Sequence, residues 1–199
     1  MTGRYEPQLI DGYKFDEVAS ALQKCIRRGL EYDACFFAYI IHKSNFGAYL
    51  FRRLAIITSE DIGNGNEHAT LVLSSLRDSW LEHHKNDKEP TLDKFLFVVH
   101  AILFLCRCKK SREGDNLTNL IDENYRSGKR LEIPTWAKDC HTEIGRKKFG
   151  RFGDLKDGME ETRIKMWDSE WSMLDKLAYT DKWRDEVLRI WLDRAKNKL

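Results

Sequence analysis

The sequence predicts an all-α protein, built as a single compact multi-helix domain with a helical tail. Apolar residues recur at helical spacing in one segment after another. Leu, Lys, Arg, Glu and Asp are frequent, whereas the 199 residues include only three prolines. No alternation of strand and helix patterns is present, so a parallel sheet is not expected. We therefore expect about eight helices.

The first helices follow a polar leader, residues 1–12, and the domain is expected to begin at residue 13. Apolar side chains at helical spacing run from Phe15 to Ile26, and Gly29 predicts the helix end. Segments with the same kind of spacing follow at residues 32–43, 48–58, 68–84, 91–108 and 116–127. Residues 129–134 should be extended, since they lead into Pro134. A short helix and a loop then complete the domain at residue 155.

The most apolar run, Phe95 to Cys108, is fourteen residues long and carries His100. Roughly 18 apolar residues are needed to span a bilayer, so this run is interpreted as a buried core helix. The first twenty residues lack the apolar region of a signal peptide. We therefore predict no membrane partner and a cytoplasmic, nucleoid-associated location, or a nuclear one in a eukaryote.

The tail, residues 156–199, holds an amphipathic stretch over about residues 160–198 with a break near residue 180. Four of the six tryptophans lie in it, at Trp167, Trp171, Trp183 and Trp191. Tryptophans at helical spacing are most often core residues, but Trp is also the favoured anchor of interfaces. The alternatives left open are a core, a partner-binding or self-association face, and stacking on single-stranded DNA.

Enzyme signatures and metal patterns give no positive signal. The phosphate-binding G-x-x-x-x-G-K-[ST], the zinc-binding H-E-x-x-H and the nucleophile motif G-x-S-x-G do not occur. The five cysteines are interpreted as reduced core residues. A zinc site using Cys106, Cys108, Cys140 and His141 is an alternative, but this spacing matches no common zinc pattern. We predict a non-enzymatic protein without metal or cofactor.

The stretch "RRLAIITSEDIG" ends an apolar run with a hydroxyl, two carboxylates and a glycine. Glu60 and Asp61 follow Arg52 and Arg53 by about two helical turns, which suggests internal ion pairs that tie helices together. The predicted structural motif consists of Arg52, Arg53, Ser59, Glu60, Asp61 and Gly63. The alternative is a hydrolase, such as a metal-dependent nuclease, that uses the two carboxylates and His68.

Two basic segments are candidates for contact with nucleic acid. In "GRKKFGRF", four cations alternate with aromatic rings, a pattern that suits phosphate contact and base stacking. In "RCKKSR", residues 107–112, the cations can also simply complement a helix dipole. The predicted DNA-binding residues are Lys109, Lys110, Arg146, Lys147, Lys148, Phe149 and Arg151. The alternative for the first segment is a solvated loop with Phe149 and Phe152 in the core.

The stretches "SALQKCIRRGLEYDACFFAYIIHK" and "LFRRLAIITSEDIGNGN" resemble the C-terminal region of the RarA/MgsA family of AAA+ ATPases, which is related to clamp loaders. Matching positions are Lys24, Ile26, Arg27, Arg52, Arg53, Leu54 and Ser59 to Gly63. Further matches are Lys110-Ser111, Ile133-Pro134, His141-Thr142, Gly145-Arg146 and Gly150-Arg151. The resemblance spans about residues 15–155, and we expect a module of this kind without the ATPase module that precedes it in the family.

The resemblance implies a clamp-loader-collar-like helical module that assembles as a homotetramer and takes part in DNA binding. The first hypothesis is therefore an oligomerisation and DNA-binding module in DNA replication, recombination or repair, acting on single-stranded or forked DNA. The alternative is a protein-interaction scaffold that binds or modulates an AAA+ ATPase or another replication protein without contacting DNA.

Overall fold

The computed structural model describes residues 7–85 and 88–149, together with a few single positions between residues 183 and 193. The chain divides into two compact units, Met1–Lys129 and Arg130–Leu199. The described residues form helices and no strand, which confirms the all-α prediction. The expected boundary between domain and tail, after residue 155, lies outside the described residues.

The first unit holds six α-helices, each close to a segment predicted from the sequence. They are α1 (Phe15–Arg28), α2 (Glu31–Lys43), α3 (Gly47–Ile57), α4 (Ala69–His84), α5 (Leu92–Arg107) and α6 (Glu113–Arg126). Three short turns, η1 (Ile10–Gly12), η2 (Thr58–Ile62) and η3 (Gly63–Gly65), complete this unit. In the second unit the described elements are η4 (Thr135–Ala137) and α7 (Glu143–Phe149).

Glycines with positive φ end two of these helices, as the sequence predicts. Gly29 has φ 72° after α1, and its N–H bonds to the carbonyls of Cys25 and Ile26. Gly128 has φ 90° just beyond α6. Residues other than glycine rarely adopt this backbone conformation, which is why glycine is common after the last helical turn.

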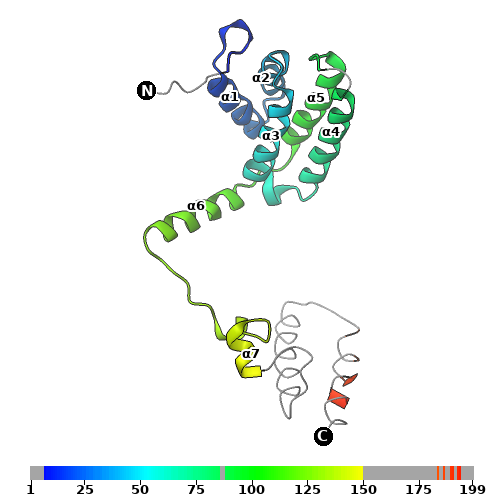
Figure 1. Ribbon diagram of the computed structural model, residues 1–199. Coiled ribbons are helices and arrows are strands. Elements are labelled where there is room, and N and C mark those ends of the chain that lie inside the picture. The colour runs from blue at the N-terminus through cyan, green and yellow to red at the C-terminus, as the bar shows by residue number, and fades with distance from the viewer. Residues whose placement is uncertain are drawn as a thin grey trace. The chain divides into compact units, whose positions relative to one another are not determined.

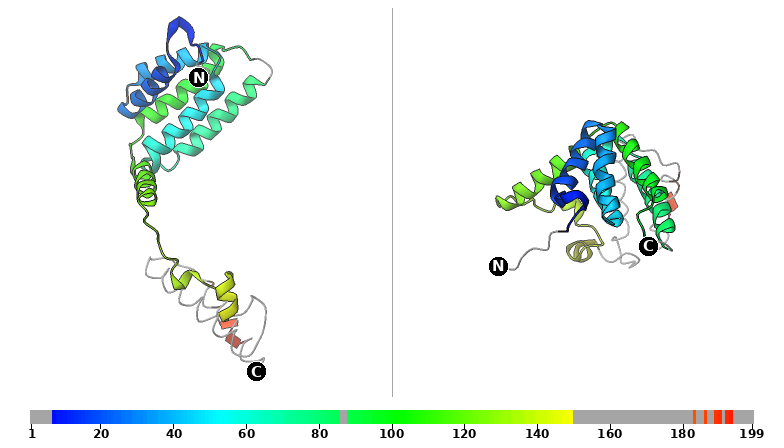
Figure 2. Two further views of the ribbon diagram at one scale, coloured as in Figure 1. Left: turned by 60° about the vertical axis from the view of Figure 1, so that its left-hand side comes forward. Right: turned by 90° about the horizontal axis from the view of Figure 1, so that it is seen from above.

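Helices α1 to α5 pack side by side as a bundle, with α6 leaving it at one end (Figures 1 and 2). Helix α5 contacts α1, α2, α3 and α4, so its apolar sequence is explained by burial. Fully buried side chains in the bundle include Leu22, Ile26, Ile41, Leu50, Leu54, Ile57, Ile102 and Leu105. Among the described residues no helix is long and apolar enough to cross a bilayer.

The end of the expected leader is packed against the bundle. Leu9 is buried, and the backbone N–H of Ile10 donates to the Ser44 hydroxyl after α2, at 2.9 Å. Residues 7–12 therefore belong to the fold, whereas the sequence suggested that they precede it. Their mixed composition hides the one buried leucine.

Candidate functional site

Among the described residues, the largest network of buried and half-buried charged side chains lies where α1, the turn η2 and the start of α6 meet. We name it the Asp61 cluster, and it consists of Gln23, Arg27, Glu60, Asp61 and Arg112. Asp61 is completely buried. A buried carboxylate is stable only when hydrogen bonds and opposite charges compensate for lost hydration.

Both carboxylate oxygens of Asp61 accept hydrogen bonds from neighbouring elements. The Nε atom of Arg27 donates to Oδ1 at 2.6 Å, and the Nε2 atom of Gln23 donates to Oδ2 at 2.9 Å. The Nη1 atom of Arg112 donates to Oδ1 at 2.9 Å. Asp61 therefore links α1 to the segment that begins α6.

Glu60 shares the same two guanidinium groups. Its Oε1 atom accepts from Arg27 at 3.1 Å and from Arg112 at 3.0 Å. Arg112 also pairs with Asp115 in the first turn of α6. The backbone N–H of Ser111 donates to the carbonyl of Asp61 at 3.0 Å, so main chain and side chains hold the two segments together.

Local backbone geometry explains how two consecutive carboxylates face one cluster. Residues Thr58–Ile62 form a π-helical turn, in which more residues make up each turn than in an α-helix. Neighbouring side chains therefore diverge less, and Glu60 and Asp61 reach the same guanidiniums. Gly63 ends the turn with φ 44° and lies against the Ser111 carbonyl, where a Cβ would be 3.3 Å away.

The predicted ionic partners of Glu60 and Asp61 were wrong. Their partners are Arg27 and Arg112, whereas Arg53 donates to Gln23 and Arg52 is exposed. Eight residues of helix rise by about 12 Å, so side chains two turns apart do not meet. Gln23 and Arg112 carry no sequence signal that separates them from other polar residues. Arg27 was singled out only by the family resemblance.

Asp61 has the electrostatics of a structural ion pair. Burial alone would raise the pKa of Asp61, but hydrogen bonds from Arg27, Gln23 and Arg112 and the charge of Arg27 outweigh it and hold this pKa below its ordinary value. Ser59 is exposed, and His68 lies before α4 with an exposed ring beside Glu67. The geometry therefore favours the structural interpretation of "SEDIG" over the hydrolase alternative.

This pKa shift predicts acid sensitivity that Asp61→Asn should reduce. Because the pKa is lower in the folded protein, the ionised carboxylate stabilises the fold above the unfolded-state pKa near 3.8, and this stability is lost as the pH falls below it. We expect the free energy of unfolding to fall less between about pH 4 and pH 2 in Asp61→Asn than in wild type. Urea unfolding at several pH values tests this, with Glu31→Gln at the exposed Arg107 pair as control; parallel pH profiles for wild type and Asp61→Asn would contradict it.

The basic segment after α5 is only partly available to a phosphate. The Lys110 ammonium donates to the carbonyls of Leu105, Cys106 and Cys108 at 2.6, 2.9 and 3.0 Å, so it caps the C-terminus of α5. These contacts agree with the helix-dipole alternative for Lys110, and its assignment to DNA binding stays a prediction. Lys109 is exposed, and its assignment to DNA binding stays a prediction.

The second basic segment forms the last turn of α7. Arg146, Lys147 and Lys148 are all exposed. The Nη1 atom of Arg146 donates to the His141 carbonyl at 2.7 Å, and Lys147 pairs with Glu143 across one helical turn at 2.8 Å. The side chain of Phe149, and all of Arg151 and Phe152, lie outside the described residues.

A tight loop positions α7. The Thr142 hydroxyl accepts the N–H of Gly145 at 3.0 Å, as a helix N-cap does. Gly145 lies against the Asp139 carbonyl, where a Cβ would be only 1.5 Å from the oxygen. The matched residues His141-Thr142 and Gly145-Arg146 thus build one loop and the helix that follows it.

The same loop contains the possible metal ligands in the described part of the chain. Donor atoms of Asp139, Cys140 and His141 all lie within 4.8 Å of one another. The Asp139 carboxylate contacts His141 Nδ1 at 2.7 Å and accepts the His141 N–H at 3.0 Å, so it already organises the loop.

Cys106, on α5 in the first unit, is buried, and burial raises the pKa of its thiol to about 11. This agrees with the interpretation as a reduced core cysteine, since a thiol that stays protonated is a weak nucleophile.

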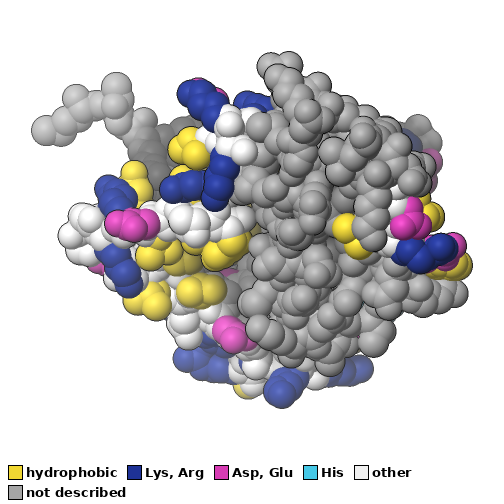
Figure 3. Space-filling model, turned by 90° about the horizontal axis from the view of Figure 1, so that it is seen from below, with side chains coloured by type: hydrophobic (Ala, Val, Ile, Leu, Met, Phe, Trp, Pro, Cys, Tyr) yellow, Lys and Arg dark blue, Asp and Glu magenta, His cyan; other side chains and the backbone are white. Residues whose placement is uncertain are grey.

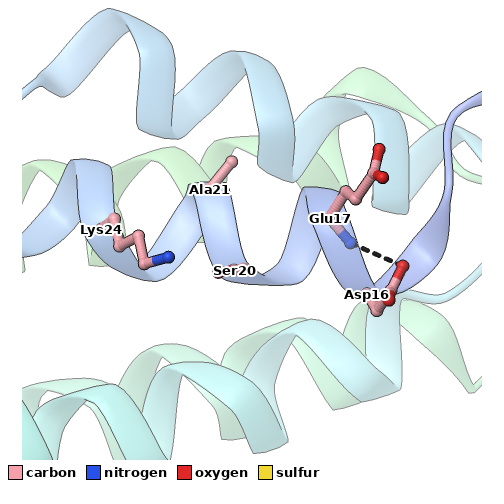
Figure 4. A pocket seen from close by; sticks show the side chains of 5 residues that line it. All are labelled: Asp16, Glu17, Ser20, Ala21 and Lys24. Carbon is pink, nitrogen blue, oxygen red and sulfur yellow. Dashed lines mark hydrogen bonds between the residues drawn. The ribbon is translucent and has the colours of Figure 1, made fainter.

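Two hollows in the first unit offer little chemistry. A shallow hollow on the outer face of α1 is lined by Asp16, Glu17, Ser20, Ala21 and Lys24, as Figure 4 shows. There the Asp16 carboxylate accepts the Glu17 N–H at 2.8 Å, so it serves the first turn of α1. A small cavity beside His42, Trp80, His84 and Lys94 has room for about one water molecule. Burial lowers the pKa of His42, which bonds to the Thr91 carbonyl.

Exposed apolar side chains form the feature that the sequence did not single out. Figure 3 shows apolar side chains among Lys and Arg side chains on the described part of one face. Helix α6 has no buried residue, yet it carries Leu117, Leu120, Ile121 and Tyr125. Of the predicted partner-binding tryptophans, Trp183 is 60% exposed, and Trp167, Trp171 and Trp191 lie outside the described residues.

Comparison with known proteins assigns no family. The chain matches no protein-family model, and no curated protein matches it. Membership of the RarA/MgsA family therefore stays a prediction from the quoted motifs.

Proposed function

We propose that this protein is a non-enzymatic oligomerisation and DNA-binding module of DNA replication, recombination or repair, similar to the C-terminal region of RarA/MgsA proteins. The observation that carries the DNA part is the last turn of α7, which exposes three consecutive cations, Arg146, Lys147 and Lys148. The Asp61 cluster supports a non-catalytic role, because its carboxylates serve to join helices.

The exposed cations of α7 suit a phosphate backbone. The Lys147–Glu143 pair is fully on the surface, and such pairs contribute only about 0–1 kcal/mol, so a phosphate can replace Glu143. Arg146 is oriented by the His141 carbonyl, which limits the freedom it would lose on binding. Cations held in this way neutralise phosphates of single strands or forks without reading sequence.

DNA binding is tested by fluorescence anisotropy with labelled single-stranded and forked DNA over a range of salt concentrations. Each phosphate contact on a single strand contributes about −0.7 to the slope of log affinity against log salt. Replacing Arg146, Lys147 and Lys148 by alanine should therefore reduce the slope by about 2 and weaken binding at low salt. Lys147→Ala/Lys148→Ala, which leaves the Arg146 contact to the loop, should reduce it by about 1.4.

A charge-matched control is available in the first unit. Lys24, Lys43 and Arg77 are exposed cations far along the chain from α7. Replacing all three by alanine removes the same net charge and should leave the salt slope nearly unchanged. A wild-type slope near zero, or equal losses in both triple variants, would contradict DNA binding through α7.

The second candidate is a scaffold that binds or modulates an AAA+ ATPase or another replication protein without touching DNA. The exposed apolar side chains of α6 favour it, since solvent-exposed apolar stripes mark interaction surfaces. Capture of a purified RarA/MgsA-type ATPase by the immobilised chain, measured by surface plasmon resonance, tests it. Failure to bind the ATPase would count against this function and leave DNA binding untouched.

The resemblance further implies a homotetramer, and the sequence predicts a location in the cytoplasm at the nucleoid, or in the nucleus. Sedimentation equilibrium of the purified chain measures the assembly directly. A monomer at all accessible concentrations would contradict the oligomerisation part of the proposal.

A further inference from the structure

Helix α6 presents an apolar stripe whose side chains are all more than half exposed. Leu117, Leu120, Ile121 and Tyr125 are spaced by three, one and four residues, so they follow one side of the helix. They are 54%, 57%, 59% and 61% exposed. Four large apolar side chains in one row form a continuous patch, whereas single exposed leucines are ordinary on a surface.

The bundle alone does not account for this helix. An isolated helix of about 12–15 residues is marginal in water, and α6 has 14 residues, none of them buried. It contacts the bundle at η2 and η3, and Glu113 in its first turn accepts a hydrogen bond from the Asn64 amide of η3 at 3.4 Å. Most amphipathic helices owe their stability to a surface packed against their apolar side.

The direction of α6 is nevertheless fixed by the Asp61 cluster. Arg112, immediately before the helix, bonds to Glu60 and Asp61, and it also pairs with Asp115 one turn into the helix. The stripe is therefore held at a set angle to the bundle. A surface that is already positioned loses less entropy when it binds.

Charge indicates what kind of surface fits the stripe. Between residues 113 and 125 the sequence has four carboxylates and no Lys or Arg. Asp115 is paired with Arg112, and Asp122 with Arg126. Glu113 and Glu123 are exposed. Glu113 lies seven residues before Leu120 and Glu123 three residues after it, so both lie near Leu120 on the surface of the helix. One edge of the stripe is thus acidic.

We propose that α6 binds a basic amphipathic helix of a partner protein. The partner would place Leu- or Ile-like side chains on Leu117, Leu120, Ile121 and Tyr125 and Lys or Arg beside Glu113 and Glu123. The stripe spans nine residues, or about 12 Å from the first to the last, so two to three turns of the partner are in contact. The proposal deepens the scaffold function and rests on it, and it is independent of DNA binding by α7.

The test uses the full chain and two fluorescein-labelled, helix-forming peptides with the same leucine seam. One peptide has Lys flanking the seam, and the other has Glu at the same positions. Fluorescence anisotropy should show binding of the Lys peptide, weakened by salt, and little binding of the Glu peptide. Equal binding of the two peptides to the wild-type chain would overturn the argument from the acidic edge.

Variants locate the binding surface. Leu120→Asp/Ile121→Asp should weaken the affinity for the Lys peptide by at least about thirtyfold, because two apolar contacts are lost. This loss is expected although the variant adds negative charge. Glu113→Gln/Glu123→Gln should weaken it by about fivefold. Leu71→Asp, at a leucine on α4 that is 68% exposed, is the matched control and should have no effect. An equal loss in Leu71→Asp would overturn the proposal.

Two further outcomes distinguish the proposed partner from a second copy of this chain and from an ATPase that binds elsewhere on the surface. If sedimentation shows a dimer that Leu120→Asp/Ile121→Asp abolishes, the occupant is a second copy of this chain and the proposed heterologous partner is wrong. If an ATPase binds the wild-type chain and the α6 variant equally, the scaffold function stands and the α6 proposal fails. Thermal melts equal to wild type confirm that the exposed substitutions leave the fold intact.

Discussion

Replacing Asp61 by alanine is expected to lower the free energy of unfolding by about 3 kcal/mol, more than any other single loss of a polar group in the first unit. Asp61 is fully buried and accepts hydrogen bonds from Arg27, Gln23 and Arg112. Its removal takes away the acceptor of the Gln23 amide and leaves Glu60 as the remaining carboxylate between the two guanidiniums. Both retain contact with solvent, which keeps the loss near the lower end of the range for buried ion pairs.

Urea unfolding followed by far-ultraviolet circular dichroism measures this loss. The matched variant is Glu60→Ala, which removes the neighbouring carboxylate from the same guanidiniums. Glu60 is 26% exposed, so its removal should lower the free energy of unfolding by about 1 kcal/mol. The interpretation of the cluster would be wrong if Glu60→Ala destabilised the protein as much as Asp61→Ala.

The fold was largely predictable from the sequence because local signals agree with tertiary packing. Apolar periodicity predicted α1, and the long apolar run predicted the buried helix α5. Gly29 and Gly128 predicted where two of the helices end. The bounds of the short helix α7 were predicted less precisely. The loop before it depends on the close approach of Gly145 to the Asp139 carbonyl.

The composition of the Asp61 cluster was only partly predictable. The carboxylates were found because they stand together after an apolar run, but Arg27 and Arg112 are 34 and 51 residues away from Asp61 in sequence. Helix period predicts which side of a helix is buried and says nothing about which other helix meets it. The π-helical turn that aims both carboxylates at one place also has no signature in residue type.

The exposure of the apolar stripe on α6 was likewise not predictable from the sequence. The apolar spacing of this segment is visible in the sequence and predicts a helix, as it does for α1. The structure shows that the stripe is exposed, because the Asp61 cluster and the segment after α5 direct α6 away from the bundle. Exposure thus depends on contacts outside the helix itself.

Gly65→Ala is expected to destabilise the first unit by about 2–3 kcal/mol through backbone contact. A Cβ at Gly65 would lie 2.3 Å from the Lys109 carbonyl oxygen and 2.9 Å from its carbon, so the η3 loop and the segment after α5 must separate. These are the segments that carry Asp61 and Arg112 to their contact, so weaker ion pairing and faster hydrogen exchange at the start of α6 should accompany the loss.

Gly114→Ala is the control that makes this argument specific. Gly114 lies in the first turn of α6 with no atom within 4 Å of an added Cβ, so alanine should stabilise the helix by up to about 1 kcal/mol. The two substitutions add the same methyl group, and only at Gly65 does it meet backbone. Urea unfolding should therefore shift in opposite directions, and equal shifts would show that α6 is not anchored through the close approach of η3 to Lys109.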